Sequence, residues 1–437
     1  MSLRVSFHTL GCKLNFSESS TLARHFEQGG FTRVESAEES DICVINSCSV
    51  TETSDKKCRY LIRRLHRNNP NAIIAVTGCY AQLRPDALSE IEGVDIVLSN
   101  NDKAEMVRAV EQIIRDGRGS KVVTSCTTDE LKNFFSAFSS GDRTRAFLKV
   151  QDGCDYKCAY CTIHYARGAS RNAPITDLVE QARKIAESGQ REVVITGINT
   201  GDFGRSTGER FIDLLRALAQ VEGIERYRIS SIEPNLLSDE IIEFCAKTKS
   251  FQHHFHIPLQ SGSDYILGRM RRRYRAEKFA DRVEQVRKFM PDTFFGVDVI
   301  VGFPGESEEH FMQTYNLLER LKPAFLHIFP YSERRGTPAV ELDQKVPHNI
   351  ANERVKRLEE LSDKLHREFC SQAIGAIDEV LFESTVRGGS IFGYTGEYRR
   401  VRVPYQKELI NRVVRVHIEG IDESGAADLI GVVAAYH

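Results

Sequence analysis

The sequence predicts an α/β protein in three parts: an N-terminal doubly wound α/β domain, a central partial barrel of six βα units, and a small C-terminal β-barrel. Two series of β-branched runs alternate with helical runs, and a stretch rich in Ser, Gly and charge separates them. The end of the chain changes to short strands with Gly turns. These patterns give predicted boundaries of 1–125, 126–145 (linker), 146–345, 346–371 (connecting helix) and 372–437.

The composition is that of an ordinary globular protein. With 437 residues, 41% apolar and 27% charged, the chain has material for more than one hydrophobic core. No apolar run approaches the roughly 18 residues that span a bilayer, and the N-terminus lacks a signal-peptide pattern. We therefore expect a cytoplasmic protein without membrane contact, whose eleven cysteines are reduced and serve as metal ligands or core residues.

In the first series, three strands are each followed by a cysteine. The runs "RVSFHTL", "DICVINS" and "AIIAVTG" are predicted strands, and Cys12, Cys48 and Cys79 come shortly after them. The carboxyl ends of parallel strands meet at one edge of a doubly wound sheet, where such sheets bind ligands, so we expect these thiols to converge. Cys43, inside a strand, and Cys58, on a basic helix, have expected core or surface roles.

The second series contains six predicted strands separated by helical runs. The strands are "AFLKVQDG", "REVVITGIN", "RYRISSIEPN", "HHFHIPLQS", "DTFFGVDVIVGF" and "FLHIFPYS". Six βα units over about 200 residues fit an open, partial version of the eightfold βα barrel, whose chemistry sits at the carboxyl ends of the strands.

A charged helical run and then short strands follow the barrel. Interleaved Arg and Tyr on these strands suit RNA, through phosphate contacts and base stacking. Because the formal net charge is only −2, nucleic-acid contact must come from local basic stretches. Three exist, at 55–67, 269–275 and 397–415, and for each the alternative is an ordinary solvated face.

The loop after the first barrel strand, "DGCDYKCAYC", carries Cys154, Cys158 and Cys161. A closed zinc site requires a fourth ligand, for which His164 is the only obvious local candidate. A four-iron cluster held by three thiolates instead leaves one iron open to a small molecule with amine and carboxylate groups. The motif favours the second interpretation, and a zinc-stabilised RNA-binding protein without turnover stays as the non-enzyme alternative.

These residues carry a family resemblance. Cys-x3-Cys-x2-Cys after the first strand of a βα barrel resembles the radical S-adenosylmethionine superfamily. The ordered motifs "GCKLNFSES", "NSCSVT", "TGCYAQ", "QDGCDYKCAYC", "HIPLQSGSDYIL", "VDVIVGFPGE" and "PYSERRGTPA" resemble its methylthiotransferase family along essentially the whole chain. One departure is visible, because Thr162 and His164 stand where the family often has Ile and Pro.

The resemblance implies two [4Fe-4S] clusters and two molecules of S-adenosylmethionine. It assigns an auxiliary cluster with an external sulfur to Cys12, Cys48 and Cys79, and the radical-generating cluster to Cys154, Cys158 and Cys161. No protein acid or base is required. It implies a TRAM-type RNA-binding barrel at the C-terminus, an electron donor such as flavodoxin or ferredoxin, and a sulfur source.

The resemblance also implies contacts to S-adenosylmethionine near the strand ends. These candidates are Tyr160, Thr196, Gly197, Asn199, Ser231, Glu233, Gln260 and Val301. For the glycine, tight turn geometry is the alternative. For Glu233 it is a carboxylate at a helix start.

The family's substrates are tRNA adenosines with an isopentenyl or a threonylcarbamoyl group, and a ribosomal-protein aspartate. The segments "GYTGEYRRVRVPY" and "HIFPYSERRGTPA" most resemble the threonylcarbamoyl branch, often called MtaB. We therefore expect conversion of N6-threonylcarbamoyladenosine beside the anticodon to its 2-methylthio derivative, with Arg399, Arg400, Arg402 and Lys407 contacting the tRNA.

Overall fold

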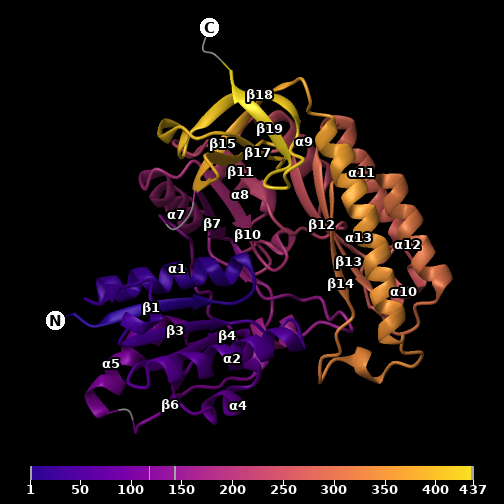
Figure 1. The fold of residues 1–437 in the computed structure, drawn as a ribbon. Coiled ribbons are helices and arrows are strands. Elements are labelled where there is room, and N and C mark those ends of the chain that lie inside the picture. Colours follow the sequence, from indigo (N-terminus) through magenta and orange to yellow (C-terminus); the bar gives the residue numbers. More distant parts are fainter. Residues whose placement is uncertain (1, 118, 142–143, 435–437) are drawn as a thin grey trace.

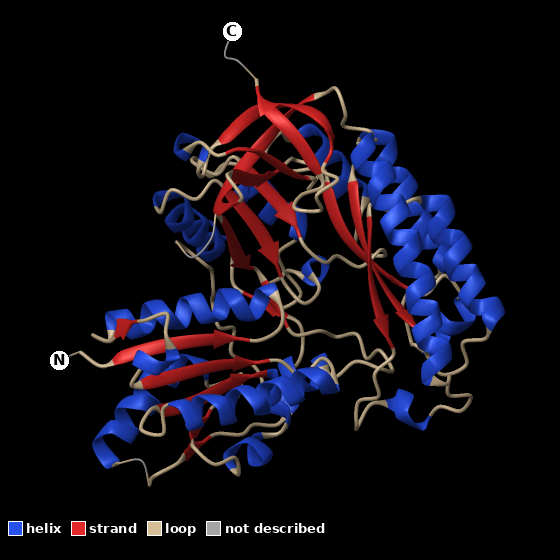
Figure 2. Cartoon of the chain, in the orientation of Figure 1, coloured by secondary structure: helices blue, strands red, loops and turns tan. Residues whose placement is uncertain are grey.

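The computed structural model describes residues 2–117, 119–141 and 144–434, which form three units (Figure 1). The N-terminal domain lies beside the carboxyl ends of the barrel strands, toward which the strand arrows point in Figure 2. The C-terminal barrel covers the opposite end. No helix in these ranges is long and apolar enough to cross a membrane.

The N-terminal domain is a six-stranded parallel sheet between helices. Its strand order is β2-β1-β3-β4-β5-β6, so the winding direction reverses between β1 and β3. The strands are β1 (Arg4–Thr9), β2 (Thr32–Arg33), β3 (Ile42–Ser47), β4 (Ile73–Gly78), β5 (Val94–Val97) and β6 (Val122–Val123). The predicted doubly wound fold is therefore confirmed.

The helices of this domain divide between the two faces of the sheet. One face packs α1 (Lys13–Gln28) and α5 (Met106–Asp116) through Leu22, Phe26 and Val110. On the other face of the sheet, α2, α3 and α4 pack to form a second hydrophobic core. Cys43 and Cys58 are buried in this core. The bounds on this side are α2 (Glu52–Asn68), α3 (Cys79–Leu83) and α4 (Pro85–Ser89), with short 3-10 turns at η1 (Ala37–Glu39) and η2 (Lys103–Glu105).

The central domain is an open barrel of six parallel strands. Two three-stranded sheets, β11-β10-β7 and β12-β13-β14, are joined by isolated bridges between Tyr227 and Phe251 and between Ser231 and His256. The strands are β7 (Arg145–Lys149), β10 (Glu192–Thr196), β11 (Arg226–Ile229), β12 (His254–Gln260), β13 (Phe294–Val301) and β14 (Phe325–Pro330). The predicted partial barrel of six βα units is confirmed.

Helices cover the outer face of this barrel. They are α7 (Ile175–Glu187), α8 (Phe211–Leu218), α9 (Asp239–Lys247), α10 (Asp264–Arg269), α11 (Ala276–Phe289), α12 (Glu308–Leu321) and α13 (His348–Ser371). Residues such as Phe255, Ile257 and Val297 point outward into the core with these helices. Because side chains alternate along a strand, His256 and Asp298 belong to the inner face, which is polar.

Short elements at the carboxyl ends of the strands build the loops around the central cysteines. They are β8 (Gln151–Asp152), β9 (Arg171–Asn172), α6 (Ile163–Arg167), η3 (Thr128–Glu130), η4 (Thr200–Asp202) and η5 (Pro338–Glu341). The segment predicted as a linker packs on both neighbours. The Phe138 carbonyl accepts hydrogen bonds from Thr21 and Arg24 of α1, and Phe138 bridges to Leu148 of β7.

The C-terminal part is a closed five-stranded barrel, as predicted. Its order is β15-β16-β17-β19-β18. The strands are β15 (Ile377–Arg387), β16 (Ser390–Tyr394), β17 (Arg400–Pro404), β18 (Val413–Ile421) and β19 (Leu429–Val433), with η6 at Lys407–Leu409. Arginines of the central barrel hold it in place, because Arg226 and Arg228 donate to four of its backbone carbonyls and Arg145 donates to the Tyr398 hydroxyl.

Candidate active site: two three-cysteine sites at one domain interface

The cysteines of the N-terminal domain follow three strands at one edge of its sheet. Cys12 caps the start of α1 after β1, Cys48 directly follows β3, and Cys79 begins α3 after β4. Gly11 has φ +99°, and a Cβ on it would lie 2.8 Å from the Cys48 Sγ. Glycine at this position therefore lets the two cysteine loops approach one another at the point where the sheet changes direction.

Burial keeps Cys48 and Cys79 protonated without a bound cation. It raises the pKa of Cys48 to about 11, with smaller contributions from Cys79 and Cys12. Burial also raises the pKa of Cys79, and the positive charge of Arg167 acts in the opposite direction. A group that binds here must supply positive charge to convert the thiols to thiolates, as metal ions do.

The central cysteines lie in one loop packed into the mouth of the barrel. Gly153 starts the loop with φ +71°, where a Cβ would lie 2.0 Å from the Ala169 carbonyl oxygen. The backbone N–H groups of Tyr156 and Ile163 donate to the Sγ atoms of Cys154 and Cys161, each at 3.4 Å. Such N–H donors stabilise thiolate ligands.

A buried arginine completes the surroundings of the central thiols. Arg272 Nη1 donates to Cys158 Sγ at 3.2 Å, and Nη2 forms an ion pair with Glu233. Burial raises the pKa of Cys161 to about 12 and also raises that of Cys158, for which Arg272 acts in the opposite direction. The site is therefore built for an anionic thiolate group that a cation neutralises.

The spacing of the thiols favours a polynuclear group over a single zinc ion. Ligands of a mononuclear zinc lie close together, because each Zn–S bond is about 2.3 Å. Within the described ranges, neither cysteine triplet has all its sulfur atoms within 4.8 Å of one another, and no such group contains His164. An iron–sulfur cluster, whose cysteines bind different iron atoms, fits both triplets.

A network of buried charges joins the two sites. Glu18 of α1 contacts Lys103, Lys149 and Arg167, and Asp152 contacts Lys149, Arg167 and Arg171; all these side chains are at most 8% exposed. Arg167 comes from α6, six residues after Cys161, and its Nη2 donates to Asn15 beside the N-terminal site at 2.6 Å.

This network fixes one loop against the other. Burial raises the pKa of Glu18, but Arg167, Lys103 and Lys149 outweigh it and hold that pKa well below its ordinary value. The Ala166 carbonyl also accepts a hydrogen bond from Asn100 of the N-terminal domain at 2.8 Å. The two three-cysteine sites therefore belong to one interdomain interface.

The comparisons with known proteins agree with this architecture. Residues 4–99 match the "Uncharacterized protein family UPF0004" and residues 148–318 match the radical SAM superfamily. The chain is 41% identical over 420 residues to a Bacillus subtilis threonylcarbamoyladenosine tRNA methylthiotransferase MtaB, covering 95% of this chain and 93% of the relative. The MtaB of Aquifex aeolicus is 38% identical and covers 84% and 90%. The chain belongs to the radical S-adenosylmethionine methylthiotransferase family.

Another family member carries a different name. A Wolinella succinogenes tRNA-2-methylthio-N(6)-dimethylallyladenosine synthase is 34% identical and covers 99% of both chains. Among solved structures, the radical S-adenosylmethionine methyltransferase TsrM of Kitasatospora setae matches with a TM-score of 0.56 and 13% identity, covering 89% of this chain and 82% of that one. At this identity the match shows the fold alone, including both α/β domains. The family implies S-adenosylmethionine and [4Fe-4S] clusters as cofactors.

Several residues expected to contact S-adenosylmethionine also make contacts within the protein that stabilise the loops at the strand ends. Glu233 forms an ion pair with Arg272 through its Oε2 atom. Thr196 donates to the Leu148 carbonyl, and a Cβ on Gly197 would lie 3.0 Å from the Gln151 Oε1 atom. Gln151 also accepts from the backbone N–H of Asn199.

Other expected contacts keep groups free at the mouth of the barrel. Gln260 ends β12 with φ +62°, and its Oε1 is buried without a hydrogen-bond partner within the described part of the chain. Tyr160 packs edge-on against Phe303, and its hydroxyl accepts from Arg272 at 3.5 Å. Ser231 uses its backbone carbonyl to accept from Thr200, and the Val301 carbonyl accepts from Tyr331. The side-chain amide of Asn199 is also buried without a hydrogen-bond partner among the described residues. All eight candidates stay predictions as cofactor contacts.

The structure changes the expected RNA contact. Arg399 is 4% exposed and its guanidinium lies 4.1 Å from the centre of the Phe369 ring, so it cannot reach a phosphate. Arg402 binds both carboxylate oxygens of Asp422, and Arg400 donates to the Ala426 carbonyl. These arginines stabilise the C-terminal barrel. Lys407 is exposed and stays a candidate.

Several arginines at the interface carry no functional signal in the sequence. The stretch at 269–275 was interpreted as a basic surface, yet Arg272 points to Cys158 and Arg269 binds Asp343. Arg334, in the "SERRGTPA" motif, binds Ser49 and Asp55 next to Cys48. A cavity of about 570 Å³ beside it is lined from both cysteine loops, including Ser49, Thr162 and Arg335. Of Arg269, Arg272 and Arg334, only Arg334 lies within one of the family motifs, which is the one signal that could have indicated its role.

Proposed function

We propose that the protein is a tRNA methylthiotransferase that converts N6-threonylcarbamoyladenosine, beside the anticodon, to its 2-methylthio derivative. The observation that carries this proposal is the junction of two three-cysteine sites at one interface, in a chain 34–41% identical to four MtaB proteins. The reaction uses two molecules of S-adenosylmethionine, one to methylate the sulfur and one to activate C2 of the base.

We assign a different cluster to each of the two three-cysteine sites. Cys12, Cys48 and Cys79 hold the auxiliary cluster, while Cys154, Cys158 and Cys161 hold the cluster beside S-adenosylmethionine. When bound, these groups supply the transferable sulfur and the electron that cleaves S-adenosylmethionine. The protein's part is to position them: Arg272 donates to Cys158, and Arg167 joins the central loop to Asn15 and Glu18 beside the N-terminal site. A low-potential donor such as flavodoxin or ferredoxin, and a sulfur source, complete the reaction.

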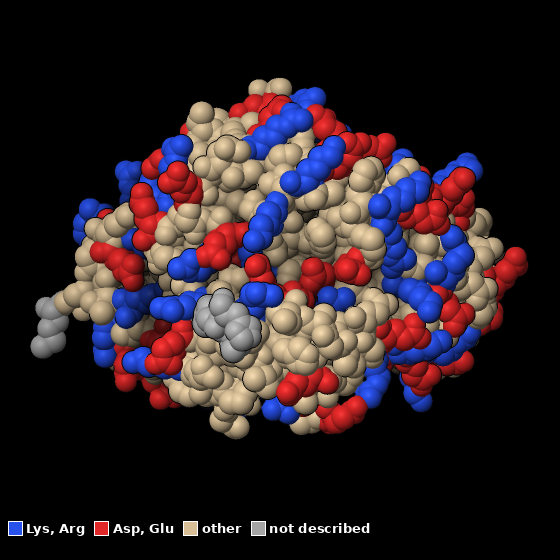
Figure 3. Space-filling view, turned by 90° about the horizontal axis from the view of Figure 1, so that it is seen from above, with Lys and Arg blue, Asp and Glu red and all other residues tan. Residues whose placement is uncertain are grey.

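The tRNA contact uses exposed cations rather than Arg399, Arg400 and Arg402, which are engaged within the barrel. On the C-terminal barrel the exposed cations are Arg387, Lys407, Arg412 and Arg415. Lys and Arg are interspersed with Asp and Glu on the face seen in Figure 3, so the phosphate contacts are local. Arg412→Ala with Arg415→Ala should weaken tRNA binding and lower its salt slope by roughly 0.7 to 0.9 per lost contact, while Arg399→Ala should instead destabilise the barrel.

The deciding test is mass spectrometry of tRNA nucleosides from cells with and without the gene. Loss of the 2-methylthio derivative of threonylcarbamoyladenosine, with its restoration by the wild-type chain, is the expected result. A change in methylthiolated isopentenyladenosine, or in a ribosomal-protein aspartate, would instead assign the protein to another branch. Purified protein with defined anticodon stem-loops gives the same comparison in vitro.

A further inference from the structure

Three side chains that can bind a metal ion meet outside the active site, between the connecting helix and the C-terminal barrel. His366 and Cys370 lie four residues apart on α13 and therefore share one face of that helix. Asp428 comes directly before β19 of the C-terminal barrel. One ligand atom of each residue lies within 4.8 Å of the others.

The separations within this group are close to those around a single zinc ion. In a tetrahedral site, Zn–S bonds of about 2.3 Å and Zn–N or Zn–O bonds of about 2.0 to 2.1 Å place sulfur and nitrogen about 3.6 Å apart, and nitrogen and oxygen about 3.3 Å apart. The Cys370 Sγ lies 3.6 Å from the His366 Nε2, and the Asp428 Oδ1 lies 3.0 Å from the same nitrogen. Only small side-chain rotations separate these atoms from a set of ligands to one ion.

Outer partners hold two of the three ligands in the orientation that a metal site requires. The His366 Nδ1 lies 3.0 Å from the Ala324 carbonyl oxygen, which can only accept, so this nitrogen carries a proton and Nε2 is the one that can bind a metal. The Oδ2 atom of Asp428 accepts from the Arg400 backbone N–H at 2.7 Å. The imidazole ring and the carboxylate are therefore fixed from behind.

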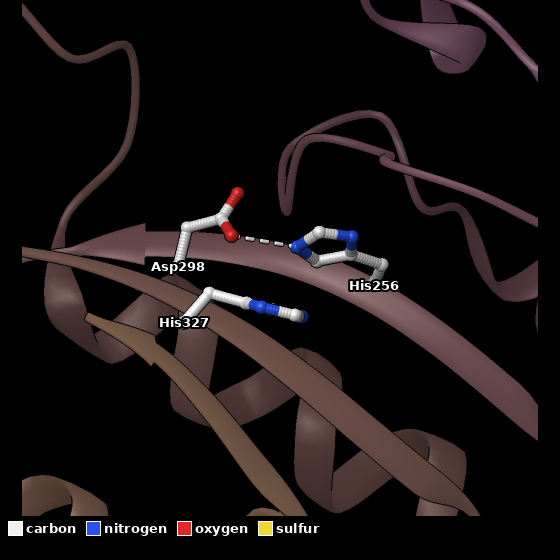
Figure 4. Close-up of side chains that lie close together, drawn as sticks. All are labelled: His256, Asp298 and His327. Atoms are coloured by element: carbon white, nitrogen blue, oxygen red, sulfur yellow. Dashed lines mark hydrogen bonds and ion pairs between the residues drawn. The ribbon is translucent and has the colours of Figure 1, made fainter. Parts of the chain in front are cut away.

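A second group of potential ligands, on the inner face of the central barrel, lacks such partners. His256 of β12, Asp298 of β13 and His327 of β14 also place one ligand atom each within 4.8 Å of the others (Figure 4). The His256 Nε2 and Asp298 Oδ1 are 2.7 Å apart, which is a direct hydrogen bond. Within the ranges that the structure describes, neither imidazole ring of that group has an outer hydrogen-bond partner. The group on α13 is therefore the better prepared metal site.

We propose that His366, Cys370 and Asp428 bind one Zn²⁺ ion, with a water molecule in the fourth position. The side chains of His366 and Asp428 are 26% and 25% exposed, so water reaches the site, whereas Cys370 is buried. One thiolate, one imidazole and one carboxylate suit zinc, which accepts sulfur, nitrogen and oxygen ligands. Because the ligands belong to α13 and to the C-terminal barrel, the bound ion stabilises the contact between them.

The competing explanation is an ion pair between a protonated His366 and Asp428, which requires no metal. In that case the Cys370 thiol only fills space in the core between α13 and the C-terminal barrel. The zinc proposal instead requires its sulfur as a ligand. Replacement of Cys370 therefore separates the two explanations.

The test uses the full-length enzyme after anaerobic reconstitution with iron and sulfide, so that the six cluster cysteines are occupied. Zinc is then added alone in small excess, unbound zinc is removed by gel filtration, and the zinc and iron contents are measured by mass spectrometry. The variants are His366→Gln, Cys370→Ala and Asp428→Asn. The matched controls are Cys245→Ala, at a cysteine buried in the core of the central barrel, and His417→Gln, at an exposed histidine of β18.

We expect about one zinc per chain in the wild type and in both controls. Each ligand variant should bind zinc more weakly, by more than the roughly 10- to 100-fold that loss of an outer partner costs. The iron content should stay unchanged in all of them. Since His366→Gln and Asp428→Asn nearly preserve side-chain size, loss of zinc at constant iron content does not reflect unfolding.

Zinc K-edge X-ray absorption of the wild type identifies the neighbours of the ion. One sulfur and about three nitrogen or oxygen neighbours are expected. Three sulfur neighbours would place the zinc in a cluster site and overturn the proposal. Absence of bound zinc from the wild type, or full zinc binding by Cys370→Ala, would overturn it as well and leave the ion pair as the explanation.

Discussion

The two three-cysteine sites reach similar surroundings by different routes. Cys154, Cys158 and Cys161 lie within eight residues of one loop, whereas Cys12, Cys48 and Cys79 come from the ends of three strands. Each site nevertheless has buried thiols with raised pKa values and one buried arginine whose positive charge opposes that rise. A local motif and a sheet edge can thus build equivalent ligand sets.

The sites differ in what they require from the rest of the protein. The arginine of the central site, Arg272, comes from the same domain. The arginine of the N-terminal site, Arg167, is supplied by the central domain and also binds Glu18. The N-terminal site is therefore completed only when the two domains dock, and it should depend more on the interface.

The largest expected effect comes from removing the central thiols. Cys154→Ala, Cys158→Ala and Cys161→Ala together should reduce the anaerobically reconstituted protein from about eight irons to about four and abolish cleavage of S-adenosylmethionine. Cys126→Ala, at a half-exposed cysteine, is the control. Iron analysis and chromatography of 5′-deoxyadenosine measure both, and 5′-deoxyadenosine from the triple variant would contradict the radical assignment.

Removing the three cysteines of the N-terminal site should separate cleavage of S-adenosylmethionine from transfer of the methylthio group. With Cys12→Ala, Cys48→Ala and Cys79→Ala, S-adenosylmethionine is still cleaved because the central loop is intact, but the methylthio product is lost. Both products can be quantified in one reaction. Full retention of the methylthio product would show that these thiols are structural.

Arg167→Met tests the dependence on docking. The change leaves Glu18 and Asp152 with fewer buried partners, and we expect a loss of about 3 kcal/mol in the free energy of unfolding, the low end for a broken buried pair because lysines remain. It should lower iron retention at the N-terminal site more than at the central one. Urea unfolding compared with Arg183→Met, an exposed arginine, measures the first effect. Equal stability of the two variants would contradict it.

Arg272→Gln should act on the central site alone. Loss of a positive charge and a hydrogen bond at Cys158 makes an added electron less favourable, so the reduction potential of that cluster should become more negative. Redox titrations followed by electron paramagnetic resonance measure each potential. Each cluster is measured in a variant whose other three-cysteine site has been changed to alanine, so that the two signals are separate. A shift of the N-terminal cluster of the same size would disprove the distinction.

The smallest effect concerns pH. Since the pKa of Glu18 is held well below its ordinary value in the folded protein, unfolding takes up a proton once the pH falls below about 4.5. Its contribution is present above that pH and is lost as the pH falls toward the folded pKa. Glu18→Gln should flatten the acid side of the stability curve. Burial raises the pKa of Glu233, so Glu233→Gln should have the opposite effect there.

The sequence by itself determined the domain order and the six cysteines. Strand patterns and the spacing of the central motif are local, and parallel strand ends meet at one edge in any doubly wound sheet, so convergence of Cys12, Cys48 and Cys79 followed from topology. The motifs also identified the family.

Only the tertiary structure decided which charges face which partners. A run of arginines is the same in sequence whether it faces solvent or a buried acceptor, and Arg272 and Arg399 are buried where a basic surface was expected. The pairing of Arg167 with Glu18 joins residues 149 positions apart, and His327 meets His256 across two strands. Such contacts depend on how separate elements pack, because a charge in a low-dielectric interior requires a partner that the local sequence does not specify.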